Sequence, residues 1–198
     1  MYSTLSNHDG ENPVDYAAFE ANPTGFTVVA CNAEDGSTKY FGKSDVGYDN
    51  FDILKASSAV PVACEPYAID GIPYYDGGIA DPVPVEQALQ AGCDKLIVVV
   101  TRERGYRKKG EAGMRLATRR YRDYPAFVHT LEHRMEIYNR SHEQLYQLER
   151  EGKAFVIAPD SIDCKRTEGR PAVIRALYDQ GFRTMQAHMP ALQDYLQA

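Results

Sequence analysis

The stretch from Ile69 to Pro82 constrains the fold of this chain more than any other. Asp70-Gly71 is a two-residue turn signal between apolar flanks, so Tyr67–Ile69 and Ile72–Tyr75 are predicted to form a small β-hairpin. The second strand leads directly into Asp76-Gly77-Gly78, and two glycines after an acid allow positive φ angles and a close approach of another backbone. The sequence therefore predicts a carboxylate at the end of a strand, on a tight turn.

Motifs on both sides of this stretch follow one another in a definite order. Upstream stands Ala56-Ser57, followed after three further residues by Pro61. Downstream, Asp81-Pro82 is predicted to start a helix that ends at Gly92, with Asp81 as its cap. The apolar run within Lys95–Thr101 then predicts a strand covered on both faces, as in a parallel sheet.

This succession resembles the C-terminal half of the patatin-like phospholipase domain, most closely that of bacterial patatin-like proteins, over about residues 25–105. The resemblance implies a partial three-layer α/β/α sheet and lipid acyl hydrolysis by a Ser–Asp dyad. The dyad aspartate corresponds to Asp76, with Gly77 and Gly78 as its supporting turn, and neither a cofactor nor a metal is implied. In that chemistry the carboxylate takes the proton of the serine hydroxyl during attack on an ester, and an apolar crevice would strengthen it as a base.

Two further motifs of that family, a Gly-rich oxyanion loop and a Gly-x-Ser-x-Gly nucleophile elbow, are not found in this chain. The nearest string, Gly42 to Gly47, has one residue too many between Ser44 and the second glycine and follows no long buried strand. Neither Ser57 nor Ser58 is accompanied by a base. The sequence thus predicts the acid half of an active site, in a truncated chain that is inactive alone.

Two alternatives stay open beside this interpretation. The small residues Ala56 to Ala59 suit close helix packing, but they would also leave room for an acyl chain or a neighbouring nucleophile. Gly42-Lys43-Ser44 is a partial match to a nucleotide-binding P-loop, which also requires a glycine where this chain has Ser37. We therefore do not expect a nucleotide site.

A basic stretch runs from Arg102 to Asp123, with nine basic residues against three acidic ones. One interpretation is a solvated loop and helix face. The other is contact with anionic lipid headgroups, worth about 1 kcal/mol per basic residue near such a surface. The candidates for this contact are Arg104, Arg107, Lys108 and Lys109. His129 and His133 are spaced for a shared metal, but without the glutamate of His-Glu-x-x-His they are expected to be surface residues.

The other elements are predicted from periodicity and turn signals. Strands are expected at about 26–32, 38–41 and 154–158, and helices at about 14–21, 50–59, 124–151, 171–180 and 184–195. Alternating strands and helices indicate an α/β fold. We expect residues 1–105 to be the C-terminal part of a patatin-like catalytic domain, and residues 106–198 to be a helical and strand extension packed on it.

Composition excludes several classes of protein. The 198 residues carry a formal net charge of −6, which gives no reason to expect nucleic-acid binding. Four scattered cysteines without Cys-x-x-Cys spacing are expected to be reduced core residues of a cytosolic protein. We therefore expect a cytoplasmic protein with a lipid or ester substrate, peripheral contact with a membrane, and self-association through an unprotected sheet edge.

Two functions compete on this basis. One is a lipid acyl hydrolase of which this chain carries the catalytic aspartate. The other is a non-catalytic lipid-binding or regulatory relative that keeps the fold and the lipid crevice. They differ by whether a Gly-x-Ser-x-Gly segment accompanies the chain.

Overall fold

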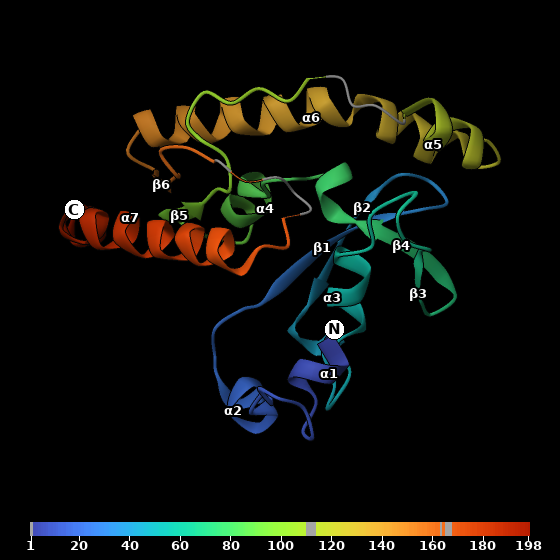
Figure 1. Ribbon diagram of the computed structural model, residues 1–198, viewed down its shortest axis with the longest axis horizontal. Coiled ribbons are helices and arrows are strands. Elements are labelled where there is room, and N and C mark those ends of the chain that lie inside the picture. Colours follow the sequence, from blue (N-terminus) through green and yellow to red (C-terminus); the bar gives the residue numbers. More distant parts are fainter. Residues whose placement is uncertain (1, 110–113, 163, 165–167) are drawn as a thin grey trace. The chain divides into compact units, whose positions relative to one another are not determined.

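The computed structural model describes residues 2–109, 114–162, 164 and 168–198, with the backbone alone at 114–116. Helices and strands follow one another along the chain (Figure 1). They are α1 (Tyr2–Ser6), α2 (Tyr16–Ala21), β1 (Thr27–Asn32), β2 (Thr38–Gly42), α3 (Asp52–Ser57), β3 (Tyr67–Ile69), β4 (Ile72–Asp76), α4 (Val85–Gln90), β5 (Leu96–Val99), α5 (Met114–Arg120), α6 (Pro125–Arg150), β6 (Ala154–Ile157) and α7 (Pro171–Gln197), with short 3₁₀ turns at Lys43–Asp45 and Gly77–Ile79. This mixture of helices and strands confirms the predicted α/β class.

The chain divides into two compact units that interleave along the sequence. The first comprises Met1–Pro84 and Lys109–Ser141, and the second comprises Val85–Lys108 and His142–Ala198. Helix α6 therefore begins in the first unit and ends in the second. The division predicted from the sequence, at residue 105, stays a prediction.

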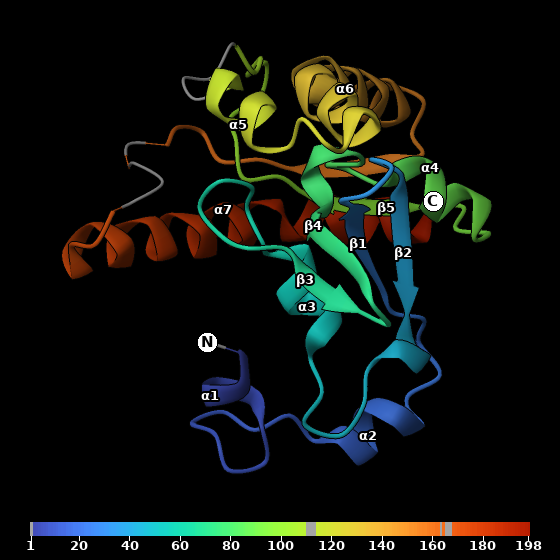
Figure 2. The same ribbon diagram turned by 90° about the vertical axis from the view of Figure 1, so that its right-hand side faces the viewer.

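The first unit contains a four-stranded antiparallel sheet in the order β2-β1-β4-β3, visible in Figure 2. Strands β3 and β4 form the predicted hairpin. Asp70 and Gly71 both have positive φ angles, 51° and 81°, as the favoured two-residue hairpin turn requires. Strand β1 pairs with β4 so that Ala30 lies opposite Asp76. The predicted hairpin and the strands predicted at about 26–32 and 38–41 are thus confirmed, and the pairing of β1 with β4 joins them into one sheet.

Both faces of this sheet are covered. On one face, Ala30 and Tyr74 belong to a buried cluster that includes Ile53 and Ala56 of α3. On the other face a second buried cluster packs against α5 and α6. Its members are Cys31, Ala33, Ala59, Tyr75, Ile79, Ala117, Tyr121, Phe127 and Leu131. Because neighbouring residues of a strand point to opposite faces, the sheet is a middle layer between helices.

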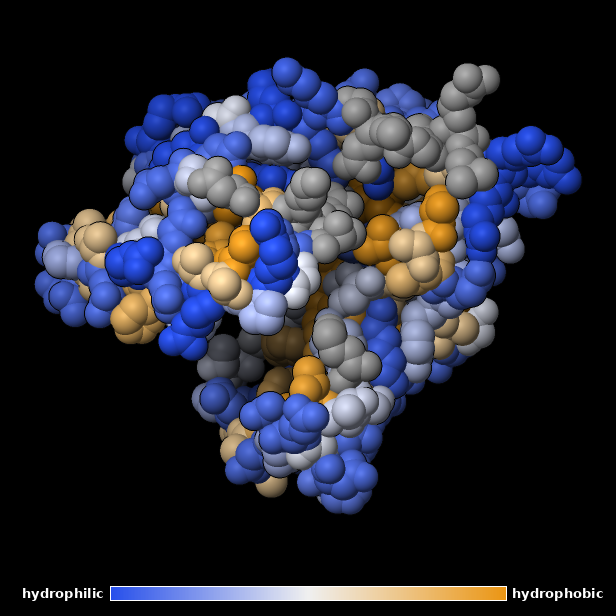
Figure 3. All heavy atoms as spheres, in the orientation of Figure 1, coloured by the Kyte–Doolittle hydropathy of each residue, from blue (hydrophilic) through white to orange (hydrophobic). Residues whose placement is uncertain are grey.

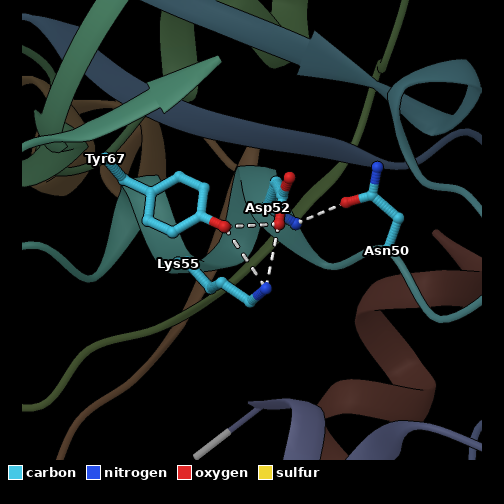
Figure 4. Close-up of polar contacts among 4 residues, drawn as sticks. All are labelled: Asn50, Asp52, Lys55 and Tyr67. Atoms are coloured by element: carbon cyan, nitrogen blue, oxygen red, sulfur yellow. Dashed lines mark hydrogen bonds and ion pairs between the residues drawn. The ribbon is translucent and has the colours of Figure 1, made fainter.

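Polar contacts fix the start of α3 against β3 (Figure 4). The Asp52 carboxylate accepts hydrogen bonds from Lys55 Nζ at 2.9 Å and from the Tyr67 hydroxyl at 2.7 Å. Burial raises the pKa of Asp52, but these bonds outweigh it and lower the pKa overall. Asn50 accepts a bond from the Asp52 amide at 3.0 Å, whereas Asp49 pairs with His8. Of these two residues, Asn50 is therefore the one that contacts the start of the helix.

The second unit contains a two-stranded parallel sheet of β5 and β6, in which Leu96 lies opposite Ala154. The prediction that β5 is covered on both faces is wrong, because Ile97 and Val99 are 47% and 71% exposed. A short apolar run does not reveal how many of its faces are covered. Coverage depends on the layer that packs against the strand, and the run itself does not specify that layer. Figure 3 shows hydrophobic residues at the surface among hydrophilic ones.

Helix α7 differs from its prediction. Two helices joined at Gly181 were expected, but α7 runs unbroken from Pro171 to Gln197. Gly181 does not adopt a positive φ angle, so it does not end a helix. The helix packs on β6 through ring contacts of Phe155 with His188 and Tyr195. One helix thus covers this strand, where the sequence predicted two helices in this part of the chain.

Among the described residues, none of the helices has the length and hydrophobicity needed to cross a membrane.

Candidate functional site

Asp76 occupies the position predicted for it, at the end of β4 and the start of the turn Gly77–Ile79. Its backbone amide donates a hydrogen bond to the Ala59 carbonyl at 2.8 Å. The residue is therefore held between β1, opposite Ala30, and the segment that follows α3. These contacts fix the backbone on both sides of the carboxylate.

The Asp76 carboxylate is half-buried and caps the turn that follows. Its Oδ1 atom accepts a hydrogen bond from the Gly78 amide at 2.8 Å. Within the described part of the chain, no serine or histidine side chain donates a hydrogen bond to this carboxylate. The geometry of a strand-end carboxylate on a tight turn is confirmed, and its catalytic role stays a prediction.

A glycine is required at position 77 because another backbone lies close to it, and not because its φ angle is positive. Neither Gly77 nor Gly78 has a positive φ angle. A Cβ atom on Gly77 would, however, lie 2.3 Å from the Val29 carbonyl oxygen, because the β1 backbone passes directly beneath it. The predicted close approach of another backbone is therefore confirmed, whereas the unusual φ angle is not.

Asp81, the neighbouring carboxylate, does not cap a helix. Helix α4 begins at Val85, so Asp81 lies too far upstream to cap it. Instead, the Tyr40 hydroxyl donates a hydrogen bond to Asp81 Oδ2 at 2.6 Å, and the Asp81 amide donates to the Gly77 carbonyl at 2.9 Å. This carboxylate is engaged in holding β2 to the turn after β4.

The serines considered as nucleophiles do not contact Asp76. The Ser58 hydroxyl lies 2.7 Å from the Tyr2 hydroxyl, and Ser57 is the last residue of α3. Ser44 is exposed and lies in the turn Lys43–Asp45, directly after β2. None of the three therefore forms a dyad with Asp76 in the described part of the chain.

The cysteines are reduced but not all buried. Cys31 lies in the core between β1 and α6, and burial raises the pKa of its thiol to about 12, with Asp35 and Asp76 adding to the effect. Such a thiol is inert as a nucleophile, since the thiolate is the reactive form. Cys64 and Cys93 are exposed, so the expectation that the cysteines are core residues is wrong for these two.

Two of the residues predicted to contact lipid headgroups already have carboxylate partners. Arg104 forms a two-pronged pair with Glu149, at 2.6 and 2.7 Å, and Arg107 pairs with Glu143 at 2.6 Å. Lys108 and Lys109 are half-buried and exposed, respectively. The headgroup contact of these four stays a prediction, and a phosphate would compete with two existing ion pairs.

An aromatic group beside Asp76 was missed by the sequence reasoning. The Tyr75 ring stacks on Phe127, with centroids 5.3 Å apart, and its hydroxyl donates to the Tyr121 hydroxyl at 3.0 Å. Burial, together with this hydrogen bond, raises the pKa of Tyr75. The group ties β4, just before the carboxylate, to α6 and the end of α5. Only the high tyrosine content of the chain could have hinted at it.

Among the residues that the structure describes, there is no candidate metal-binding site. Histidine, cysteine, aspartate and glutamate side chains there do not gather in groups of three or more. His129 and His133 lie close, with ring centroids 4.1 Å apart, but the His133 Nδ1 atom bonds to the His129 carbonyl. His129 is exposed and His133 is half-buried on α6.

Comparisons with known proteins match two separate parts of the chain. Residues 12–89 match the family model described as patatin-like phospholipase, and residues 124–197 match a domain of unknown function (DUF6363). The uncharacterized protein YjjU of Escherichia coli (strain K12) is 35% identical over 77 residues. That match covers 38% of this chain and 21% of the relative, so the chain spans about a fifth of the curated relative's length. The resemblance deduced from the Asp-Gly-Gly region is confirmed for residues 12–89.

Proposed function

We propose that this chain, whose residues 12–89 match the patatin-like phospholipase family, contributes the acid half of a lipid acyl hydrolase site with Asp76 as the base. The substrate class is a lipid or carboxylic ester. The nucleophilic serine is supplied by a segment that carries the Gly-x-Ser-x-Gly motif.

The observation that carries the proposal is how Asp76 is held. Its backbone is fixed by Ala59 and by pairing with β1, and Gly78 engages one carboxylate oxygen at 2.8 Å. The other oxygen, Oδ2, accepts no hydrogen bond from a described residue. A fixed carboxylate with one available oxygen suits proton transfer to and from a neighbouring hydroxyl.

The reaction would proceed in two steps. As the serine Oγ bonds to the ester carbonyl carbon, its proton passes to Asp76. The bond to the leaving alcohol then breaks, and the alcohol takes that proton. Water adds to the acyl-serine with Asp76 again accepting the proton, which returns to the serine as the fatty acid leaves.

The first experiment labels the purified chain with a fluorophosphonate serine probe and measures its intact mass. We expect no adduct, because no serine among the described residues hydrogen-bonds to Asp76. An adduct on the chain would place a nucleophile within it and would overturn the assignment of an acid half.

The second experiment joins the chain to a patatin-like segment that bears the Gly-rich loop and the nucleophile elbow. Asp76→Asn should lower turnover of a p-nitrophenyl acyl ester by about 10²–10⁴-fold, the usual contribution of a general base, and should leave thermal unfolding unchanged. The matched control is Asp81→Asn, which removes the neighbouring carboxylate and should change turnover only a few-fold. Equal turnover in the Asp76 variant and the wild type would refute the role of Asp76.

A non-catalytic lipid-binding protein is the second candidate. It is favoured by the lack of a serine or histidine contact to Asp76 in the described residues. A joined protein that folds and binds vesicles, but neither labels with the probe nor hydrolyses esters, would support this candidate over the hydrolase.

A further inference from the structure

A hollow of about 430 Å³ lies in the first unit, between the turn that follows α3 and the end of α5. This volume is within the about 300–1,000 Å³ of small-molecule sites. The lining residues are Val62, Arg119, Arg120, Arg122 and Asp123. None of them takes part in the chemistry proposed for Asp76.

The wall formed by the turn is held in an unusual conformation. Val62 has a φ angle of +71°, which a β-branched residue rarely adopts. Its amide donates a hydrogen bond to the Tyr121 hydroxyl at 2.9 Å, and that hydroxyl also accepts from Tyr75. Strain of this kind persists only where surrounding contacts fix the backbone. The turn and the end of α5 are thus tied together around the hollow.

The charge of the lining is mainly positive, with three guanidinium groups against one carboxylate. Arg120 is occupied, because it pairs with Glu65 and its guanidinium lies over the Tyr121 ring. Arg122 is 3.8 Å from Asp123, and both side chains are about four-fifths exposed. Arg119 forms no ion pair with a residue that the structure describes. Two arginines are therefore available to an anion that enters the hollow.

We propose that this hollow binds a phosphate group, held chiefly by Arg119 and Arg122. Guanidinium groups match phosphate oxygens with paired hydrogen bonds, and arginine is favoured over lysine where this planar recognition matters. Arg120 acts as a brace that holds the turn through Glu65. Asp123 opposes the anion.

Two sources could supply the phosphate: a free phosphate ester or a lipid headgroup. The turn presents exposed apolar side chains beside the arginines, with Val60 37% and Val62 40% exposed. Ala59, just before this turn, accepts a hydrogen bond from the Asp76 amide through its carbonyl. An ester with an apolar part fits this surface, so we assign the headgroup of a phospholipid. That assignment of the source rests on the proposed function, whereas phosphate binding itself does not.

The test compares the wild type with a double variant, Arg119→Gln with Arg122→Gln, in two assays. In the first assay, calorimetry measures the binding of inorganic phosphate at low salt. Co-sedimentation uses vesicles of phosphatidylcholine with or without phosphatidic acid. The double variant should bind phosphate at least about tenfold more weakly, since hydrogen bonds to charged groups are among the strongest in proteins. It should also lose the preference for vesicles that contain phosphatidic acid.

The matched control, Arg140→Gln with Arg175→Gln, removes the same charge from exposed positions elsewhere and should leave both assays unchanged. Asp123→Asn should bind phosphate more tightly, a gain that a misfolded variant could not produce. Equal binding by the double variant and the wild type in both assays, with no gain in the Asp123 variant, would overturn the proposal.

The remaining outcomes separate the two inferences. Phosphate binding that depends on the arginines, without any preference for phosphatidic acid, would support the site and refute the lipid source. Asp76→Asn should leave phosphate binding unchanged, so a failure of the proposed hydrolase would not by itself alter this result.

Discussion

Gly77 has no space for a side chain because the backbone of β1 runs beneath it. The Val29 carbonyl carbon would lie 2.5 Å and its oxygen 2.3 Å from a Cβ atom at this position. Backbone atoms cannot move aside as a flexible side chain could. The residue next to the candidate base is thus determined by the packing of the turn after β4 against β1, independently of catalysis.

Gly77→Ala should therefore destabilise the chain by at least about 2 kcal/mol, at the upper part of the range for overpacking. Urea unfolding followed by circular dichroism measures this loss. The control is Gly25→Ala in the same unit, where a Cβ atom would meet nothing within 4 Å. Unfolding midpoints that coincide for the two variants would contradict the close approach at Gly77.

At the scale of the element, the segment after β5 is held to the end of α6 and to β6 by one arginine. Arg104 Nη2 donates to the Val156 carbonyl at 2.9 Å in addition to its pair with Glu149, and the Val156 amide donates to Glu149 at 3.3 Å. The Arg104 guanidinium also lies over the Tyr146 ring. This arginine, a sequence candidate for lipid contact, thus has a structural role in the second unit.

The Arg104–Glu149 pair predicts a pH dependence of stability. Its hydrogen bond lowers the pKa of Glu149, so the stabilisation is fully present above the ordinary glutamate pKa of about 4.3 and is lost as the pH falls through the lowered value. Glu149→Gln should cost about 1 kcal/mol at pH 7, and the difference from wild type should shrink below about pH 4.3. Thermal unfolding between pH 7 and pH 3 measures both effects.

The control for this prediction is Glu143→Gln, which breaks the more exposed pair with Arg107. There both side chains are about three-fifths exposed, so the loss should stay within about 0.5 kcal/mol at any pH. A difference between Glu149→Gln and wild type that does not change with pH would rule out the ion pair as its cause.

A substitution at Gly181 tests whether helix α7 is continuous. Inside an exposed helix, Gly→Ala stabilises by about 0.5–1 kcal/mol, and a Cβ atom here would meet nothing within 4 Å. Gly181→Ala should therefore raise the urea midpoint. A lowered midpoint would favour the two helices expected from the sequence, since alanine is strained at a joint with positive φ.

At the scale of the whole molecule, the two units differ in how far their sheets are covered by other residues. In the first, helices cover both faces of a four-stranded sheet. In the second, β5 pairs with β6, and Ile97 and Val99 are exposed. The candidate base and the arginine-lined hollow both belong to the first unit, so their geometry does not depend on how the second is placed.

Features that depend on a few neighbouring residues could be deduced from the amino-acid sequence alone. The hairpin at Asp70-Gly71 follows from turn chemistry, and the position of Asp76 at a strand end follows from that hairpin. The long helix α6, ending before Gly152, follows from apolar spacing and a glycine with a φ angle of +73°. These preferences are local, so they can be deduced without knowing the fold.

Contacts between groups far apart in the chain, in contrast, become visible in the folded structure. The sequence places Arg104 and Arg119 in one basic stretch, yet Arg104 pairs with Glu149 and Arg119 lines a hollow together with Val62. The reason for Gly77 likewise lies in Val29, which belongs to another strand. The partner of a charge and the space beside a backbone depend on contacts between residues far apart in the chain, and local propensity does not specify such contacts.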